Sequence, residues 1–279
     1  MKALAGVLFV LALCACAHSP QQNAQRSVVA RRIVSLMPSL TEDLCAIGAG
    51  RQIVGVSQYS TDIPCVKGVT AVGNFASVDA ERIVRLHPDA VVGIPSQRLM
   101  TENVRRTGIP TVFFADDTFN DLFSDIAQLG SLSGRDAQAR QLAESLRRRT
   151  GALRASERFR RHPSVFFVEQ AQPIWTVGPQ SYISELIVMA GGRNAVRSLP
   201  QAYAQYSPET LVSLQPDAIV ATNDAHLDLV LDREPWRSLR AVREGHVFVL
   251  QDEAILVRPG PRYNQGLQWL IERLRPLAT

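Results

Sequence analysis

The stretch Glu81–Val92 has the sequence ERIVRLHPDAVV, and the stretch Glu209–Val220 has the sequence ETLVSLQPDAIV. The two lie 128 residues apart and are identical at seven of twelve positions. In each copy apolar residues recur with the period of one helix face, a proline ends the helix, and a short apolar run follows. Such a run is typical of a strand buried in a parallel sheet. The repeat therefore predicts two lobes that are built alike.

Strands and helices alternate on both sides of each copy. The helix after the first strand is expected to begin with Ser39 as N-cap, because Glu42 follows three residues later in the pattern of a capping box. Strands separated by helices predict an α/β fold with central, mainly parallel sheets. The expected strands are Arg32–Leu36, Ile53–Ser57, Ala90–Ile94, Thr111–Ala115, Val165–Val168, Ala218–Ala221 and Val247–Leu250, and two further helices are expected at Ser181–Ala190 and Arg262–Leu274.

A different kind of segment separates the two copies. Between Asp136 and Arg161 there is no proline and only one glycine, Gly151, among Ala, Leu, Glu, Gln and Arg residues. This composition predicts one helix, roughly 39 Å long at 1.5 Å per residue, which His162-Pro163 ends. A single long helix is a stiff connector. We therefore divide the chain into an N-terminal α/β lobe at 32–134, a connecting helix at 135–162 and a C-terminal α/β lobe at 163–279.

Length and composition agree with two globular lobes. The 279 residues are 46% hydrophobic and 20% charged, which is ordinary for a protein with a packed core and excludes a disordered chain. The formal net charge of +4 comes with many arginines, yet no region gathers them into a long basic tract. The densest run, 147–149, lies in a helical pattern with Glu144 nearby. Without a clustered basic surface and a recognised module, nucleic acid is excluded as a partner.

The first residues predict an export signal. Lys2 precedes the apolar run Ala3–Leu13, which is too short to span a membrane as a helix. The run ends in a pattern that resembles a bacterial lipobox, with Cys16 as the lipidated residue because Ala15 before it is small. The alternative is an ordinary cleaved signal. We expect a lipoprotein signal peptide at 1–15, a flexible tether at 16–31 and a periplasmic body held at the membrane by its lipid.

Export also changes how the remaining cysteines, Cys45 and Cys65, are interpreted. Disulfides persist in an oxidising compartment, so a bridge from the first helix to the proline-containing loop around Cys65 is one expectation. Two buried free thiols are the other, since the sequence does not give the distance between the Cα atoms. No Cys-x-x-Cys pair is present, so neither a redox site nor a zinc site is expected.

A search for catalytic motifs finds none. The sequence contains no Gly-x-Ser-x-Gly, no His-Glu-x-x-His, no phosphate-binding loop and no Gly-x-Gly-x-x-Gly. The five histidines include no pair at i and i+4, and a metal site needs convergent donors. We therefore predict no catalytic residue, no metal site and no resident cofactor.

Four segments carry a family resemblance: RIVSLMPSLTE at 32–42, VGVSQY at 54–59, VG at 72–73 and ERIVxLxPD at 81–89. They resemble the substrate-binding proteins of ABC importers, in the helical-backbone class that serves cobalamin, haem and iron–siderophores. The resemblance spans roughly Arg31–Pro276 and is nearest to the cobalamin binders. It implies two lobes joined by one long helix, a ligand cleft between them and no catalysis. It also implies a monomer that works with a permease dimer and its ATPase.

The resemblance assigns roles to individual residues of the cleft. In the cobalamin binders aromatic side chains from both lobes line the cleft, and a flat macrocycle indeed needs aromatic faces with a few polar groups for orientation. Burial in the core is the alternative for an isolated aromatic such as Phe75. Trp175 precedes a Thr-x-Gly turn, a poor position inside a strand, which favours the cleft. The resemblance implies that Tyr59, Phe75, Trp175 and Tyr203 contact the ligand, with Asp252 and Arg258 at the polar end of the site.

Glu81 and Glu209 occupy equivalent places at the start of the two repeat helices. A carboxylate at a helix start is favoured by the helix dipole, which is one explanation for both. The resemblance implies another, in which each glutamate reaches an arginine of one permease subunit.

We therefore expect a lipoprotein that captures cobalamin and delivers it to an inner-membrane permease. Within the same class, haem remains an alternative because Tyr59 could bind its iron axially. A ferric siderophore remains another, with Arg98, Arg258 and Arg262 meeting its negative charge. An exported enzyme or an adhesin on this fold is a more distant alternative.

Overall fold

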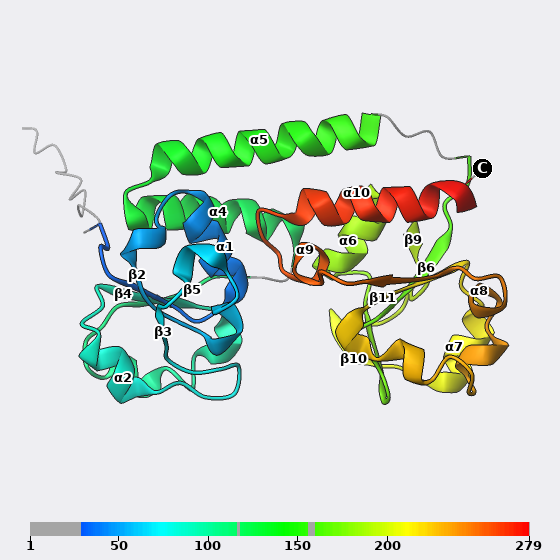
Figure 1. Cartoon of the computed structure of the whole chain (residues 1–279), viewed down its shortest axis with the longest axis horizontal. Coiled ribbons are helices and arrows are strands. Elements are labelled where there is room, and N and C mark those ends of the chain that lie inside the picture. Colours follow the sequence, from blue (N-terminus) through cyan, green and yellow to red (C-terminus); the bar gives the residue numbers. More distant parts are fainter. Residues whose placement is uncertain (1–28, 116–117, 156–159, 279) are drawn as a thin grey trace, which may run out of the picture.

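The computed structural model describes residues 29–115, 118–155 and 160–278. The expected signal peptide, Cys16 and most of the expected tether lie outside the described residues. Figure 1 shows two lobes side by side along the long axis of the molecule, with one long helix running over both. Among the described residues, no helix is long and apolar enough to cross a membrane.

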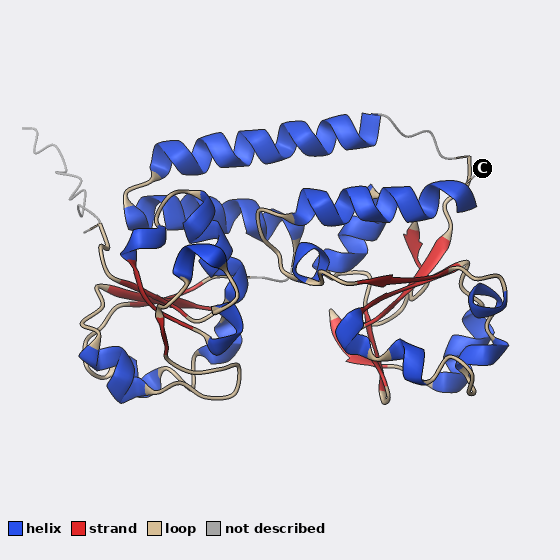
Figure 2. Ribbon diagram, viewed as in Figure 1, coloured by secondary structure: helices blue, strands red, loops and turns tan. Residues whose placement is uncertain are grey.

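The N-terminal lobe contains one parallel sheet of five strands in the order β3-β2-β1-β4-β5. Helices flank this sheet on both faces (Figure 2). The predicted parallel α/β lobe is therefore confirmed. The strands are β1 Ile33–Ser35, β2 Ile53–Val56, β3 Thr70–Ala71, β4 Ala90–Gly93 and β5 Thr111–Phe113, and the helices are α1 Pro38–Ala46, α2 Ala80–Arg85, α3 Glu102–Arg105 and α4 Phe119–Ser133.

The C-terminal lobe contains a parallel sheet in the order β12-β11-β6-β9 and a small antiparallel sheet in the order β10-β8-β7. The parallel sheet agrees with the prediction, whereas the antiparallel sheet was not predicted. The strands of the C-terminal lobe are β6 Ser164–Val168, β7 Gln170–Ala171, β8 Ile174–Val177, β9 Arg193–Asn194, β10 Tyr203–Gln205, β11 Ala218–Thr222 and β12 Val247–Leu250. The helices of this lobe are α6 Tyr182–Met189, α7 Pro208–Leu214, α8 Arg240–Arg243, α9 Ala254–Val257 and α10 Tyr263–Leu274.

The predicted long helix is α5, Asp136–Ala155, which packs on α4 of one lobe and on α10 of the other. Thr150 fixes the second contact, because its hydroxyl lies 2.5 Å from the Tyr263 hydroxyl and donates to Asn264 Oδ1 at 2.9 Å. The predicted end at Arg161 is wrong. The N–H groups of Arg160 and Arg161 donate to the carbonyl of Ala278 instead of continuing the helix.

The predicted start of α1 is also wrong. Met37 is the N-cap, Pro38 is the first helical residue and Ser39 is already inside the helix, where it is buried. Proline suits this position because its fixed φ is helical and its missing N–H would have had no partner there. Glu42 makes no capping bond and pairs with Arg258.

The repeat builds the same joint in both lobes. His87 and Gln215, one residue before each proline, have left-handed φ values of 46° and 42°. The aspartate after the proline then binds the start of the neighbouring strand. Asp89 Oδ2 accepts from the N–H of residues 31 and 32 at 2.7 and 2.9 Å, and Asp217 Oδ2 accepts from the N–H and hydroxyl of Ser164, both at 2.7 Å.

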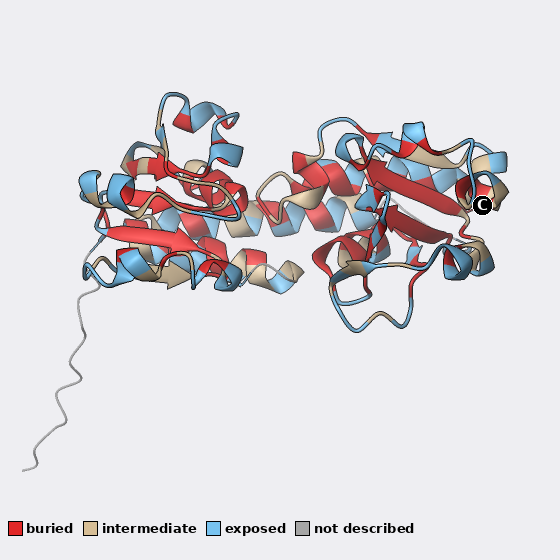
Figure 3. Cartoon of the chain, turned by 90° about the horizontal axis from the view of Figure 1, so that it is seen from below, coloured by how far each residue is buried: buried red, intermediate tan, exposed pale blue. Residues whose placement is uncertain are grey.

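One apolar core runs through both lobes, and its buried strands lie at the centre of each (Figure 3). Aromatic rings join the lobes on the side of the sheets that faces α5 (Figure 1). Phe119 of α4 contacts Tyr263 of α10 edge-on at 4.8 Å and Tyr182 of α6 at 6.3 Å between ring centroids. Contacts of this kind, together with α5, give the two lobes a shared interior.

Cys45 and Cys65 form a disulfide, with their Cα atoms 6.2 Å apart. Of the two expectations for these residues, the bridge is the one that the structure contains. It ties the end of α1 to the turn at Pro64–Val66.

Candidate ligand-binding cleft

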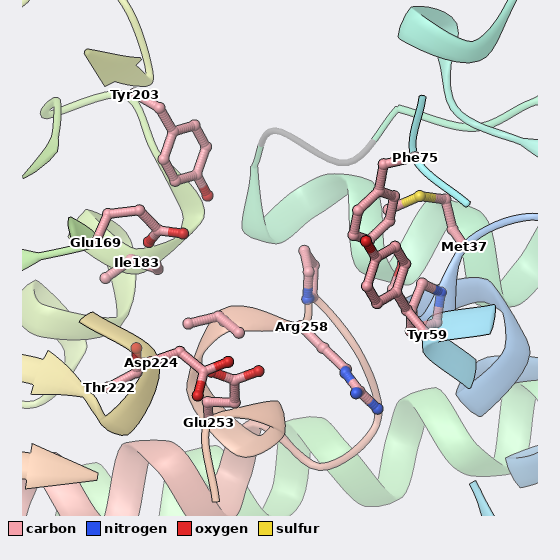
Figure 4. A pocket seen from close by; sticks show the side chains of 14 residues that line it. Met37, Tyr59, Phe75, Glu169, Ile183, Tyr203, Thr222, Asp224, Glu253 and Arg258 are labelled. Carbon is pink, nitrogen blue, oxygen red and sulfur yellow. The ribbon is translucent and has the colours of Figure 1, made fainter. Parts of the chain in front are cut away.

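A cavity of about 450 Å³ lies between the two lobes (Figure 4). Its volume falls in the usual range for ligand pockets. Met37 follows β1, Glu169 follows β6 and Asp224 follows β11, so the carboxyl ends of parallel strands from both lobes meet here, where α/β sheets bind ligands. The lining residues are Met37, Pro38, Ser39, Tyr59, Phe75, Glu169, Ile183, Tyr203, Thr222, Asp224, Glu253, Val257, Arg258 and Pro259.

The wall formed by the N-terminal lobe is aromatic. Tyr59 and Phe75 stack with their centroids 4.3 Å apart and their planes 12° apart, and they are 44% and 49% exposed. Short turns hold both residues in place. Ser57 Oγ accepts from the N–H of Tyr59, and Asn74 Oδ1 accepts from the N–H groups of residues 76 and 77. The stacked pair thus presents apolar surface to the cleft before any ligand arrives.

Gly73 makes the second of these turns possible. Its φ of 152° is rare for other residues, and a Cβ atom there would lie 2.4 Å from the carbonyl oxygen of Ser77. Any side chain at this position would push the turn that carries Phe75 away from Tyr59.

The wall formed by the C-terminal lobe is acidic. Glu169, Asp224 and Glu253 point into the cleft (Figure 4). The protein packed around Glu169 raises the pKa of its carboxyl, and the Glu253 charge raises it further, although the side chain remains open to water in the cleft. Burial, followed by the Asp224 charge, likewise raises the pKa of Glu253.

Arg258 reaches the floor of the cleft, but its guanidinium is engaged by two carboxylates of the other lobe. Nη1 lies 3.2 Å from Glu42 Oε1 and Nη2 lies 3.3 Å from Asp62 Oδ2. Burial raises the pKa of Glu42, although the positive charges of Arg258 and Arg262 oppose this shift.

The structure brings four of the six predicted ligand contacts to the cleft, namely Tyr59, Phe75, Tyr203 and Arg258. Asp252 is not among the lining residues and forms an ion pair with Arg262.

Trp175 is not among the lining residues either. The expected turn position is wrong, because Trp175 lies inside β8, the central strand of the antiparallel sheet. Its partner on β10 is Gln205, and Tyr203 pairs with Val177 two residues further on. Trp175 and Tyr203 therefore lie on the same face of that sheet. The Trp175 side chain is 37% exposed, but it does not line the cavity that Tyr203 lines.

Sequence reasoning missed the three carboxylates of the acidic wall and Met37. Their common signal is a position just after a buried strand or just before a short helix. Which residues at such positions lie close together depends on the order of the strands in the sheets, and the sequence alone does not give that order.

The other two arginines that were expected to meet an anionic ligand, Arg98 and Arg262, contact protein side chains instead. Arg98 lies over the ring of Phe113, 4.5 Å from its centroid, and Arg262 pairs with Asp252. Among the described residues, no group of three or more His, Cys, Asp or Glu side chains could hold a metal ion.

Glu81 and Glu209 are exposed at the starts of α2 and α7, on the side of the molecule opposite α5 (Figure 1). Other residues cap these helices. Asp79 accepts from the N–H of Arg82, and Ser207 accepts from the N–H of residue 210. Ser207 also donates to Glu209 at 2.6 Å, which lowers the pKa of that carboxyl.

Comparison with known proteins agrees with this architecture. The sequence model of a family described as periplasmic binding protein matches residues 33–254. A Bacillus subtilis relative, described as the uncharacterized ABC transporter substrate-binding lipoprotein YvrC, is 30% identical over 88% of this chain and 80% of its own length. A vitamin B12-binding protein of Vibrio parahaemolyticus is 30% identical over 83% of this chain and 84% of its own length.

Solved structures share the two-lobe fold. The periplasmic vitamin B12 binding protein BtuF of Vibrio cholerae has a TM-score of 0.78 and 26% identity over 88% of this chain and 97% of its own. A periplasmic haem-binding protein of Pseudomonas aeruginosa has a TM-score of 0.76 and 26% identity over 90% of this chain and 95% of its own.

Proposed function

Because this chain belongs to the periplasmic binding protein family, we propose that its cleft captures cobalamin and that the protein delivers it to an inner-membrane permease. The chain is a substrate-binding protein of an ABC transporter and not an enzyme. Proteins of this class bind a small molecule and work with a permease and an ATPase. The cargo and the delivery step are the parts that we propose.

The exposed aromatic pair on one wall is the observation that carries the proposal. Stacked rings in a 450 Å³ cavity expose flat apolar surface that water solvates poorly. A ligand with a broad planar ring system covers that surface and gains stacking energy from it. A corrin ring is such a system, and so is haem, so this wall supports a planar macrocycle without choosing between them.

The acidic wall supports cobalamin over the alternatives. Glu169, Asp224 and Glu253 present acceptor oxygens to the cleft. The corrin ring carries amide side chains, whose N–H groups can donate to carboxylates. Haem carries propionates and ferric siderophores are commonly anionic, and like charges placed opposite each other are repelled. Arg258, a cation in the cleft lining, is already bound to Glu42 and Asp62.

Visible absorption tests the proposal. The purified chain is incubated in turn with cyanocobalamin, hemin and a ferric siderophore, and the unbound compound is removed by gel filtration. We expect the cyanocobalamin spectrum to elute with the protein and the other two spectra to elute separately. Retention of hemin or of the siderophore in place of cyanocobalamin would refute the proposal that cobalamin is the cargo. A tyrosinate band with hemin, lost in Tyr59→Phe, would then identify Tyr59 as its iron ligand.

We also propose that Cys16 carries a lipid that anchors the protein to the membrane. The apolar run Ala3–Leu13 and the small residue Ala15 support this, as does the lipoprotein description of the Bacillus subtilis relative. Cys16→Ser should move the protein from the membrane fraction to the soluble periplasmic fraction, because a lipid supplies the anchoring energy. If the variant stays with the membrane, the lipid anchor is refuted.

A further inference from the structure

Arg258 joins the two lobes at the floor of the cleft. It follows α9 of the C-terminal lobe, whereas Glu42 lies on α1 and Asp62 lies in the loop after β2. Its two ion pairs, at 3.2 and 3.3 Å, therefore connect residues that are 216 and 196 positions apart. In Figure 4 the side chain extends from the loop of the C-terminal lobe toward the Tyr59 wall.

Arg258 lies between two cavities and lines both of them. On one side is the ligand-binding cleft. On the other is a cavity of about 370 Å³, which Glu42, Asp62 and Arg262 line together with the Cys45–Cys65 disulfide. The guanidinium is thus a bridge across the space between the lobes.

The bridge is largely withdrawn from water. The side chain of Arg258 is 16% exposed and that of Glu42 is 7% exposed. A buried ion pair of this kind adds little to net stability, but its geometry is sharply defined, and removal of one partner leaves an uncompensated charge. The backbone is close as well, since a Cβ atom at Gly260 would lie 3.2 Å from Glu42 Oε2.

We propose that Arg258 is a positioning residue, which sets the separation of the two lobes in the unbound protein by binding Glu42 and Asp62. This differs from the direct ligand contact that the family resemblance implied. Helix α5 and the contact of Phe119 with Tyr263 also join the lobes, and at the floor of the cleft Arg258 joins them. The inference goes beyond the proposed function because it applies to the empty cleft, whatever its ligand.

The test measures the distance between the lobes without any ligand. Spin labels are attached through Leu99→Cys in one lobe and Leu229→Cys in the other, whose native side chains are 89% and 63% exposed. Cys14 and Cys16 are replaced by serine in the full chain, and the native disulfide does not react. Pulsed electron paramagnetic resonance then gives the distribution of distances. For the parent chain we expect a narrow distribution.

The decisive variant is the double substitution Glu42→Gln with Arg258→Gln, which leaves no unpaired buried charge. We expect its distance distribution to broaden and its mean to shift, with little change in Tm. Asp62→Asn, at a side chain that is 65% exposed, should fold in any case and cause a smaller broadening. Arg262→Gln is the control, because its nearest contact with Glu42 is 3.9 Å, and it should leave the distribution unchanged. Unchanged distributions in the double variant and in Asp62→Asn would overturn the inference, even if Tm falls.

Discussion

Asp43 of α1 is a carboxyl that the fold buries without a partner. The residue is 1% exposed, and neither oxygen accepts a hydrogen bond from a described residue. Burial raises the pKa of Asp43 well above its ordinary value, and the charges of Asp125 and Glu42 raise it further. The folded chain therefore retains a proton that the unfolded chain releases above about pH 3.9, so this group lowers stability as the pH rises.

Asp43→Asn should remove this pH-dependent cost. We expect the free energy of unfolding at pH 7 to rise by about 1–4 kcal/mol and to change little near pH 3, where aspartate is protonated in both states. Urea unfolding of both chains at the two pH values measures the difference. Asp228→Asn, at an exposed aspartate, is the control and should have no effect. A variant that is no more stable than the parent at pH 7 would show that Asp43 is ionised at no cost.

At the scale of elements, the most informative part of the repeat is the aspartate between its helix and its strand, because that aspartate binds the start of a neighbouring strand. Asp217 binds the start of β6 through Ser164 and also pairs with Arg161 and Arg240, at 2.7 and 2.5 Å. Partial burial alone would raise the pKa of Asp217, but the bonds from Ser164 and the two arginine charges outweigh it and lower the pKa. The stabilisation is therefore present above the ordinary aspartate pKa and is lost as the pH falls through the lowered value.

Asp217→Ala should destabilise the protein by about 2 kcal/mol at pH 7, because several hydrogen bonds to a charged group are lost. The difference from the parent chain should shrink in acid, below about pH 4. Asp89→Ala is the matched substitution in the other lobe. It should cost less, because Asp89 is exposed while the Asp217 side chain is 12% exposed. Thermal unfolding between pH 3 and 7 measures both, and equal losses in the two variants would contradict the argument.

The sequence predicted those elements whose signals are local. Glu81–Val92 and Glu209–Val220 contain a complete helix, a terminator and a strand, so both copies appear in the structure as expected. The antiparallel sheet of β7, β8 and β10 was not predicted, because its strands are two to four residues long and gain their order from pairing. Trp175 was misplaced for that reason. Ser39 matches the capping-box pattern with Glu42, but Pro38 begins the helix one residue earlier, so Met37 is the N-cap.

The cleft could be predicted only in part, for a related reason. Tyr59 and Phe75 follow motifs that a resemblance can locate. Glu169, Asp224 and Glu253 converge from three separate segments, and nothing local marks any of them. The ion pairs of Arg258 with Glu42 and Asp62 span most of the chain, so the sequence could offer Arg258 as a ligand contact but could not show that its charge is already bound.

At the scale of the whole molecule, two exposed carboxylates face the same side. α2 and α7 lie opposite α5, one in each lobe (Figure 1), and their capping is done by Asp79 and Ser207. Glu81 and Glu209 are therefore not needed as caps. We propose that each meets a basic residue on one permease subunit, so that the pair sets the orientation of docking.

Glu81→Ala and Glu209→Ala should weaken uptake in reconstituted vesicles and leave the Kd for cyanocobalamin unchanged. The double reversal to arginine should lower uptake about tenfold or more, because it places like charges in contact. Glu144→Arg on α5 is the matched control, since Glu144 is also exposed and also faces an arginine one turn later, as Glu81 does. Normal uptake by the double reversal would contradict the docking role and would leave only the interaction of both glutamates with the helix dipole.

The central claim is that the cleft binds a corrinoid against its aromatic wall, and calorimetric titration with cyanocobalamin tests it most directly. We predict one site per chain for the parent protein. Tyr59→Ala and Phe75→Ala should each raise the Kd about tenfold with little change in Tm, because these rings are exposed and contribute area to the ligand more than to the core. Absence of binding by the parent chain, or an unchanged Kd in both variants, would contradict the account.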